Sequence, residues 1–185
     1  MIYVITGKTS SGKDSVVKIM VDKYGFNKIP TFTTRNKRKG EKEGITYHYL
    51  SKKEFEQKIE DGFFAEWKLY HATEGDVYYG SSIESYETAK DNSVIILTPD
   101  GYRDVVGNVN KPLMLLYIYA NNQTIKERLI KRGDKPEEAS RRLLHDNEDF
   151  KGVENMVDRI IYNNSKNNID DVVNTIIKYV EKRDK

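Results

Sequence analysis

The sequence predicts an α/β protein, in which a parallel-sheet core is covered by helices on both faces. Three apolar runs typical of buried strands lie at 93–97 (SVIIL), 113–119 (LMLLYIY) and 158–162 (DRIIY). Helical patterns precede or follow them, for example at 122–132 and 168–183. Strands that alternate with helices in this way are typical of a parallel sheet, because parallel neighbours need crossover connections.

The first strand, helix and intervening loop form a phosphate-binding pattern. An apolar strand at 2–6 (IYVIT) stops at Gly7, and residues 13–24 carry apolar side chains at helical spacing. The loop between them fits G-x-x-x-x-G-K, so that backbone N–H groups and the helix N-terminus can cradle phosphate oxygens while Lys13 reaches the outer phosphates. The predicted phosphate site consists of Gly7, Lys8, Thr9, Ser10, Ser11, Gly12, Lys13, Asp14 and Ser15.

Asp14 departs from the usual loop, which places a Ser or Thr hydroxyl at this position to help hold magnesium. Its carboxylate can bind magnesium directly or through water. Alternatively, it only stabilises the first turn of its helix through the helix dipole, worth about 0.3–1 kcal/mol. Ser15 cannot replace it, because one step along a helix turns the side chain by about 100°. We favour the magnesium-associated role.

Two segments differ in character from the core. Residues 31–82 are rich in Tyr, Gly and charge, and we expect an insertion with its own small mixed sheet. Residues 128–150 are highly charged, and we expect a pair of helices with little to bury that form a mobile lid. The remaining segments, 1–30, 83–127 and 151–185, form the predicted core of a single domain, the number that 185 residues favours.

The bulk composition excludes several classes of protein. With 37% hydrophobic and 32% charged residues, the chain has no apolar run near the roughly 18 residues of a membrane span. It shows no signal peptide and no cysteine, so we expect neither disulfides nor thiolate metal sites, and a cytoplasmic location. The net charge of +2 is nearly balanced, which argues against a nucleic-acid partner.

Several motifs follow the phosphate loop in a definite order. They are TFTTRNKRKGEKEGITYHY (31–49), FFAEW (63–67), VYYGS (77–81), KERLIKRG (126–133), RRL (141–143) and IIYN (160–163). In this order and spacing, over nearly the whole chain, the sequence resembles the guanylate kinase family. The resemblance implies a kinase that transfers phosphate from ATP to GMP with magnesium, giving ADP and GDP. It also implies that dGMP serves as acceptor, because no residue identified here reads the 2′-hydroxyl.

The resemblance implies an acceptor site for GMP. In the family, two arginines and two tyrosines grip the GMP phosphate, and arginine forks suit phosphate oxygens in two-point contacts. Guanine presents N1–H and N2–H₂ donors on one edge, and Glu66 stands where the family carboxylate accepts from them. Hydroxyls at Thr31 and Ser81 match those directed toward the base. The implied GMP-binding set is Thr31, Arg35, Arg38, Glu41, Tyr47, Glu66, Tyr79, Ser81 and Asp100.

The resemblance also implies which groups carry the transfer. Phosphoryl transfer needs donor and acceptor held in line and the charge on the moving group neutralised. Lid arginines do this in the family, although helix-surface arginines that aid solubility are the alternative. The implied catalytic set is Lys13, Arg38, Arg128, Arg132 and Arg142, and Asn163 matches a position near the adenine of ATP.

The magnesium site is the part of the resemblance that departs most from the family. Asp100 matches the second aspartate of a family D-x-D element, and Thr98 stands in place of the first. Together with Asp14, this suggests that negative charge near the metal is redistributed, with Asp14 and Asp100 as the predicted magnesium residues.

Two other functions stay open. The string G-K-D-S resembles ribose 1,5-bisphosphate kinases of the same fold, Lys37 replaces a family proline, and HATEGDV (71–77) is longer than the usual connection. Glu66, Thr31 and Ser81 together disfavour a sugar bisphosphate, which has no guanine to read. A non-catalytic guanylate-kinase-like binding module is the second alternative, disfavoured by Lys13 and the lid arginines. Either a monomer or a homodimer is compatible with the sequence.

Overall fold

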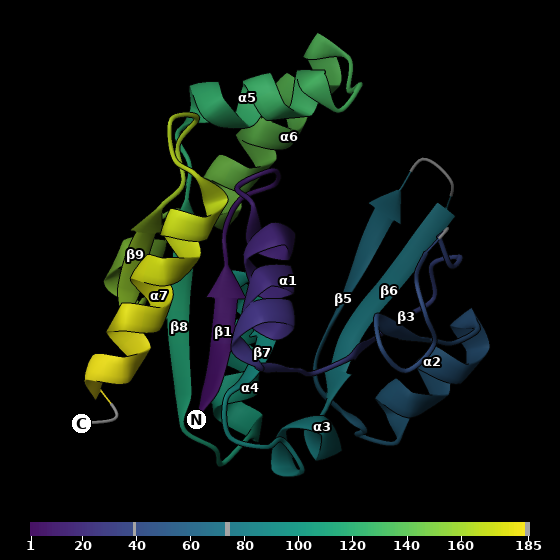
Figure 1. Cartoon of the computed structure of the whole chain (residues 1–185). Helices are drawn as coiled ribbons and strands as arrows, with labels where there is room; N and C mark the ends of the chain where they lie inside the picture. Colours follow the sequence, from purple (N-terminus) through teal and green to yellow (C-terminus); the bar gives the residue numbers. More distant parts are fainter. Residues whose placement is uncertain (39, 73–74, 184–185) are drawn as a thin grey trace.

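A five-stranded parallel sheet forms the centre of the fold. The computed structural model describes residues 1–38, 40–72 and 75–183. The strand order is β2-β7-β1-β8-β9, and every neighbouring pair is parallel (Figure 1). Their bounds are β1 Ile2–Thr6, β2 Asn27–Lys28, β7 Ser93–Ile96, β8 Leu113–Tyr119 and β9 Arg159–Tyr162. The predicted strands are confirmed, with β7 ending one residue earlier and β9 beginning one residue later than expected.

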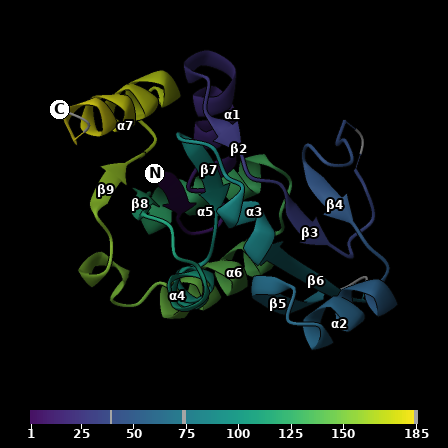
Figure 2. The same ribbon diagram turned by 90° about the horizontal axis from the view of Figure 1, so that it is seen from below.

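Helices cover both faces of this sheet, as Figure 2 shows from below. Because side chains alternate along a strand, Tyr3 and Ile5 point to one face, where they pack with α1 (Lys13–Tyr24) and α7 (Ile169–Arg183). Ile2 and Val4 point to the other face, toward the side of α3 (Ile83–Glu87) and α4 (Pro99–Asn108). The central strands are therefore buried on both sides, which explains why they read as continuous apolar runs.

The segment between β2 and α3 folds into a second sheet, as predicted. Its order is β4-β3-β6-β5, with β3 and β4 parallel and the other two pairs antiparallel. The bounds are β3 Thr31–Thr33, β4 Tyr47–Tyr49, β5 Phe64–Ala72 and β6 Gly75–Ser82. Residues 73–74, part of the connection predicted to be longer than usual, lie outside the described residues. On either side of them the ladder continues through the pairs His71 with Asp76 and Ala72 with Gly75.

A small aromatic core joins this sheet to α2 (Lys52–Glu60). Ser51 and Glu54 form a capping box that fixes the start of the helix. The buried ring of Phe55 then stacks on Phe64, with centroids 4.3 Å apart, and on Tyr78, with centroids 5.0 Å apart. The inserted region thus has a core of its own.

Two helices lie at the top of Figure 1: α5 (Asn122–Lys131), whose last turn enters the predicted lid segment 128–150, and α6 (Pro136–Asp149), which lies within that segment. The expectation that they have little to bury is wrong. Ile125, Leu129 and Ala139 are fully buried, and Leu143 packs against them. The apolar side chains of α5 and α6 lie on the faces where the two helices pack against each other. In the sequence they are interspersed with charged residues, so no continuous apolar run marks them. None of the helices in the described part of the chain is long and apolar enough to cross a membrane.

We expect Phe55→Ala to lower the free energy of unfolding by about 3–5 kcal/mol, because it leaves a cavity beneath two stacked rings. Chemical denaturation measures this. Leu144→Ala removes a side chain that is 68% exposed and should change stability by no more than about 0.5 kcal/mol. Equal effects of the two changes would show that the aromatic core does not hold the inserted region.

Candidate active site

The loop between β1 and α1 wraps around the amine of Lys13. The Lys13 Nζ donates hydrogen bonds to the backbone oxygens of Gly7, at 2.6 Å, and Lys8, at 2.9 Å. Gly12 has a φ of 101°, and a Cβ there would lie 2.4 Å from Nδ2 of Asn163, so only glycine fits. Burial lowers the pKa of Lys13, while the nearby carboxylates of Asp14 and Asp146 oppose that shift.

Two residues from distant elements hold this loop in place. Buried Asn163, at the end of β9, donates to the backbone oxygen of Ser11 at 2.8 Å. Arg128 of α5 donates to the backbone oxygens of Ser10, at 3.2 Å, and Asn163, at 3.0 Å. The guanidinium predicted to act on the transferred phosphate therefore lies on carbonyls of the loop in this structure, where it positions the loop.

On the opposite side, a network of charged and phenolic groups orients Arg35. Its guanidinium forms a two-point contact with Glu41, at 2.8 and 2.9 Å, donates to the Tyr79 hydroxyl at 3.2 Å and lies 5.2 Å from the centre of the Tyr47 ring. Arg35 lowers the pKa of Glu41 to about 2. Glu41, predicted to bind GMP, holds Arg35 in this structure, and it also accepts from the hydroxyl of Tyr49, a residue that the sequence reasoning missed.

Glu66 and Ser81 face each other across the β5–β6 ladder. The Ser81 hydroxyl donates to Oε1 of Glu66 at 2.7 Å and lies 2.7 Å from the hydroxyl of buried Tyr86, which the sequence reasoning also missed. Burial of the carboxyl raises the pKa of Glu66 to about 7, and the Ser81 hydrogen bond partly opposes this. Gly80 allows the close approach, because a Cβ there would lie 2.9 Å from the backbone oxygen of Glu66.

The two predicted magnesium residues have different neighbours. Asp14 is exposed beside Ser15 in the first turn of α1. Burial lowers the pKa of Lys13 and of Lys28, and the charge of Asp14 partly opposes both shifts. Asp100 pairs with Arg103 at 2.5 Å and with Lys68 at 3.7 Å. Thr98, which stands in for a family aspartate, caps α4 by accepting from the Gly101 N–H at 3.1 Å. Within residues 1–38, 40–72 and 75–183, no three His, Cys, Asp or Glu are grouped to hold a metal.

Arginines from separate segments meet at one hollow. Its volume is about 490 Å³, and it is lined by Thr9, Arg38, Arg132, Gly133, Asp134 and Arg142. Asp134 pairs with Arg132, at 3.1 Å, and with Arg142, at 3.2 Å, and Glu138 also pairs with Arg142, at 2.8 Å, so three guanidinium groups face two carboxylates. The structure therefore brings the phosphate loop, the inserted sheet and the lid around a space that attracts anions.

A second hollow, of about 380 Å³, lies where the chain leaves β8 and β9. Amide and hydroxyl side chains dominate its lining of Asn121, Gln123, Thr124, Asn164, Ser165, Lys166 and Asn167. Asn121 accepts from the N–H of Thr124, while its own N–H donates to Asn164. This hollow adjoins Asn163, which contacts the phosphate loop.

Thr31, the hydroxyl predicted to face the acceptor base, lies on β3 beside Tyr47 of β4.

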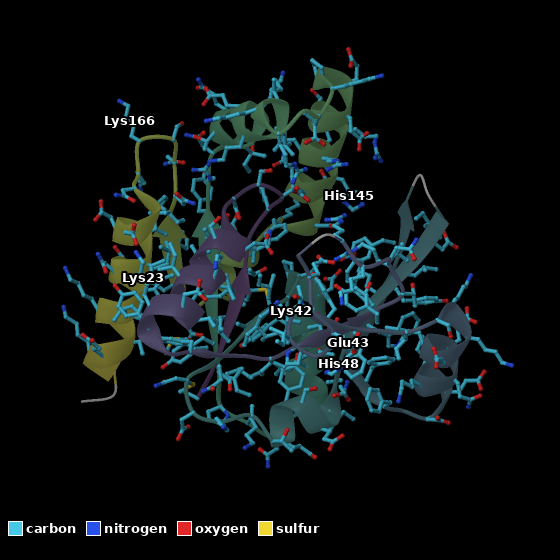
Figure 3. All side chains as sticks on the ribbon, turned by 45° about the vertical axis from the view of Figure 1, so that its right-hand side comes forward. Lys23, Lys42, Glu43, His48, His145 and Lys166 are labelled. Atoms are coloured by element: carbon cyan, nitrogen blue, oxygen red, sulfur yellow. The ribbon has the colours of Figure 1, made fainter. Side chains whose placement is uncertain are left out.

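Asp146 of α6 is a further residue that no sequence motif indicates. Its carboxylate accepts a hydrogen bond of 2.6 Å from the backbone N–H of Thr9 in the phosphate loop. Figure 3 shows the neighbouring His145 on the side of the molecule where Lys42, Glu43 and His48 of the inserted region lie. The end of α6 thus lies between the loop and the inserted region.

Comparisons with known proteins agree with this arrangement. The guanylate kinase family model matches residues 1–183. A guanylate kinase from Fusobacterium nucleatum is 29% identical over 97% of this chain and 95% of its own, and one from Wolinella succinogenes is 34% identical over 78% of this chain and 68% of its own. A crystal structure of guanylate kinase from Anaplasma phagocytophilum superposes with a TM-score of 0.69 at 19% identity, covering 99% of this chain and 85% of that chain. The family model and the two relatives confirm the resemblance to the guanylate kinase family, and the crystal structure confirms the fold.

The raised pKa of Glu66 has a consequence for stability. The folded protein holds the proton of Glu66 more tightly than the unfolded chain does. The contribution of this proton to the free energy of unfolding is therefore fully present below pH 4.5 and is lost as the pH rises to about 7. We expect the stability of the wild type relative to Glu66→Gln to fall by about 2 kcal/mol across that window. Urea unfolding at pH 4.5 and 7.5 measures it.

Glu87→Gln, at an exposed position of α3, is the matched control and should show no such trend. If both variants follow the same pH dependence, the buried position of the Glu66 carboxyl is disproved.

Proposed function

Because the chain belongs to the guanylate kinase family, we propose that it transfers the terminal phosphoryl group of ATP to GMP, giving ADP and GDP with magnesium as cofactor. The observation that carries this proposal is the arginine-lined hollow. Thr9 of the phosphate loop borders it on one side, and Arg38 of the inserted region borders it on the other. Glu66, on β5 of the second sheet, recognises the guanine base of the acceptor. We propose that dGMP also serves, since no residue of the site is assigned to the 2′-hydroxyl.

On the donor side, the phosphate loop binds the phosphates of ATP. Lys13 now donates to two loop carbonyls, and the same ammonium can turn to phosphate oxygens without leaving the loop. The base lies in the amide-lined hollow beside Asn163, where side-chain amides offer both donors and acceptors. Arg128 contributes by holding the loop carbonyls, a positioning role that supports the cradle.

On the acceptor side, Arg35, Arg38, Tyr47 and Tyr79 bind the phosphate of GMP. Glu41 holds Arg35 by two hydrogen bonds before any ligand arrives, so little side-chain freedom is lost on binding. The Glu41 carboxylate also accepts from the Arg38 N–H at 2.8 Å, which links both arginines to one anchor.

Glu66 selects guanine over adenine. Ionised, its carboxylate accepts from N1–H and N2–H₂, which adenine lacks on the corresponding edge. The hydroxyl chain from Tyr86 through Ser81 holds the carboxyl in place. Thr31, from the neighbouring part of the sheet, adds a hydroxyl toward the base.

In the transfer step, an oxygen of the GMP phosphate attacks the γ-phosphorus of ATP. A new P–O bond forms as the bond from that phosphorus to the β–γ bridging oxygen breaks, and ADP leaves with the electron pair. Arg38, Arg132 and Arg142 surround the hollow and neutralise the charge on the moving group. Closure of the lid over it excludes water, a competing acceptor.

Magnesium fits the residues present. This ion usually keeps several waters and binds through one or two carboxylates and substrate phosphates, so it requires no three-residue cage. When bound, it neutralises donor-phosphate charge. We propose that Asp14, beside Lys13, and Asp100 hold its water shell.

The remaining alternatives differ in acceptor or in activity. A ribose 1,5-bisphosphate kinase would not need the chain of Glu66, Ser81 and Tyr86, and a binding module would not need Lys13 wrapped by the loop. We further propose a cytoplasmic location and a monomeric or homodimeric state, which fractionation and gel filtration test.

A coupled assay of ADP release distinguishes the three functions. We expect ADP release that depends on GMP. Release only with ribose 1,5-bisphosphate would replace GMP by that sugar as acceptor, and no release with either would favour the binding module.

We expect Glu66→Gln to lower kcat/KM for GMP by about 10- to 100-fold, because a charge-assisted hydrogen bond is worth about 1.5–3 kcal/mol. Lys13→Ala should abolish turnover while GMP binding, measured by calorimetry, changes far less. Unaltered GMP kinetics in Glu66→Gln would disprove the guanine assignment.

We also expect the KM for GMP to rise by up to about tenfold when the pH falls from 7.5 to 6, because a protonated Glu66 cannot accept both guanine donors. In Glu66→Gln only the GMP phosphate, which titrates near pH 6, should contribute. Steady-state kinetics at matched ionic strength measures the difference, and parallel profiles would contradict the prediction.

A further inference from the structure

The C-terminal end of α6 docks on the phosphate loop through two consecutive residues. Oδ2 of Asp146 accepts from the backbone N–H of Thr9 at 2.6 Å, and Oδ1 of Asn147 accepts from Nζ of Lys8 at 2.5 Å. These partners are 137 and 139 residues apart in the chain. Figure 1 shows α6 descending from the top of the molecule to the loop that follows β1. A part of the lid is thus bonded directly to the proposed donor site.

The group bonded to the loop is itself an anion. Backbone N–H groups of such a loop donate to phosphate oxygens when a nucleotide binds. The N–H of Thr9 already donates to a carboxylate oxygen, the same class of acceptor. Thr9 also borders the arginine-lined hollow, so this N–H lies at the end of the loop where the phosphate is transferred.

The charge of Asp146 is stabilised by the groups that would stabilise a phosphate. Burial raises the pKa of this carboxyl, while the Thr9 N–H and the charge of Lys13 lower it. Burial lowers the pKa of Lys13, and the charge of Asp146 in turn partly opposes that shift. The carboxylate therefore uses both contributions of the cradle, a backbone donor and the lysine charge.

We propose that Asp146 is an internal competitor of the donor phosphate: in the nucleotide-free enzyme its carboxylate takes the place of a phosphate oxygen at the Thr9 N–H, and thereby sets the affinity for ATP. This inference rests on the proposed donor site. Two anions cannot share one cradle without a cost in repulsion, so ATP displaces the carboxylate on binding. Arg142 precedes Asp146 by one helical turn on the same face of α6. Release of Asp146 therefore frees the segment that carries an arginine of the transfer hollow.

The test is Asp146→Asn, which keeps an oxygen acceptor of similar size and removes the charge. We expect the Kd for ATP to fall about tenfold, equivalent to about 1.4 kcal/mol. Calorimetry without GMP measures it, with and without magnesium. Inorganic triphosphate, which has no base or ribose, should show the same gain. If Asp146→Asn does not fold, Asp146→Ser carries the same expectation.

The matched control is Asp149→Asn, which makes the same charge change on the same helix. Asp149 pairs with His145 at 3.2 Å, and we expect less than about a twofold change. An ATP affinity in Asp146→Asn that equals the control, or is weaker than wild type, overturns the proposal. Weaker binding only with magnesium also overturns it, since Asp146 would then act on the metal.

Failure of the donor site itself gives a different result. In that case neither ATP nor triphosphate binds to the wild type or to any variant, and Lys13→Ala changes nothing. If ATP and triphosphate bind to the wild type and this binding is lost in Lys13→Ala, the proposed donor site is supported. The comparison of Asp146→Asn with Asp149→Asn then tests the role of Asp146 separately.

Discussion

The wrapping of the phosphate loop around Lys13 is the constraint on which the rest of the structure depends. A loop that directs N–H groups outward turns carbonyl oxygens inward, and those of Gly7 and Lys8 are satisfied by the lysine amine. Asn163 and Arg128 bind further carbonyls of the same loop from β9 and α5. Three elements of the fold thus meet at one set of backbone oxygens, and the opposite face of the loop is left for phosphate.

The inserted sheet uses two different means to prepare its polar groups. Arg35 and Glu41 are held as a pair of opposite charges, so neither is buried without a partner. Glu66 forms no ion pair with any residue that the structure describes, and burial raises its pKa although the Ser81 hydroxyl donates to it. Such a carboxyl is costly to ionise until a ligand supplies donors. The Arg35–Glu41 pair is therefore preformed electrostatically, whereas Glu66 is held through the Ser81 hydroxyl.

Much of the fold could be predicted, because its signals are local. Apolar runs gave β1 and β8 with their observed bounds, and helical spacing gave α1. The motif order identified the family, although the roles of individual site residues stay predictions. The buried cluster of the lid was missed because Leu129 and Ala139 lie on either side of a charged turn. The contact of Asp146 with Thr9 joins residues 137 positions apart, and no local pattern encodes it.

The two ends of the β5–β6 hairpin are under different structural constraints. Glu66 and Ser81 lie at the base of the ladder, and the pairs from Trp67 with Gly80 to Ala72 with Gly75 lie between them and the tip. A slip of one residue would turn Glu66 to the other face of the sheet, so the base must keep its register. Residues added at the tip leave that register intact. The hairpin is therefore a position where a reporter peptide can be grafted without disturbing the pairing of Glu66 with Ser81.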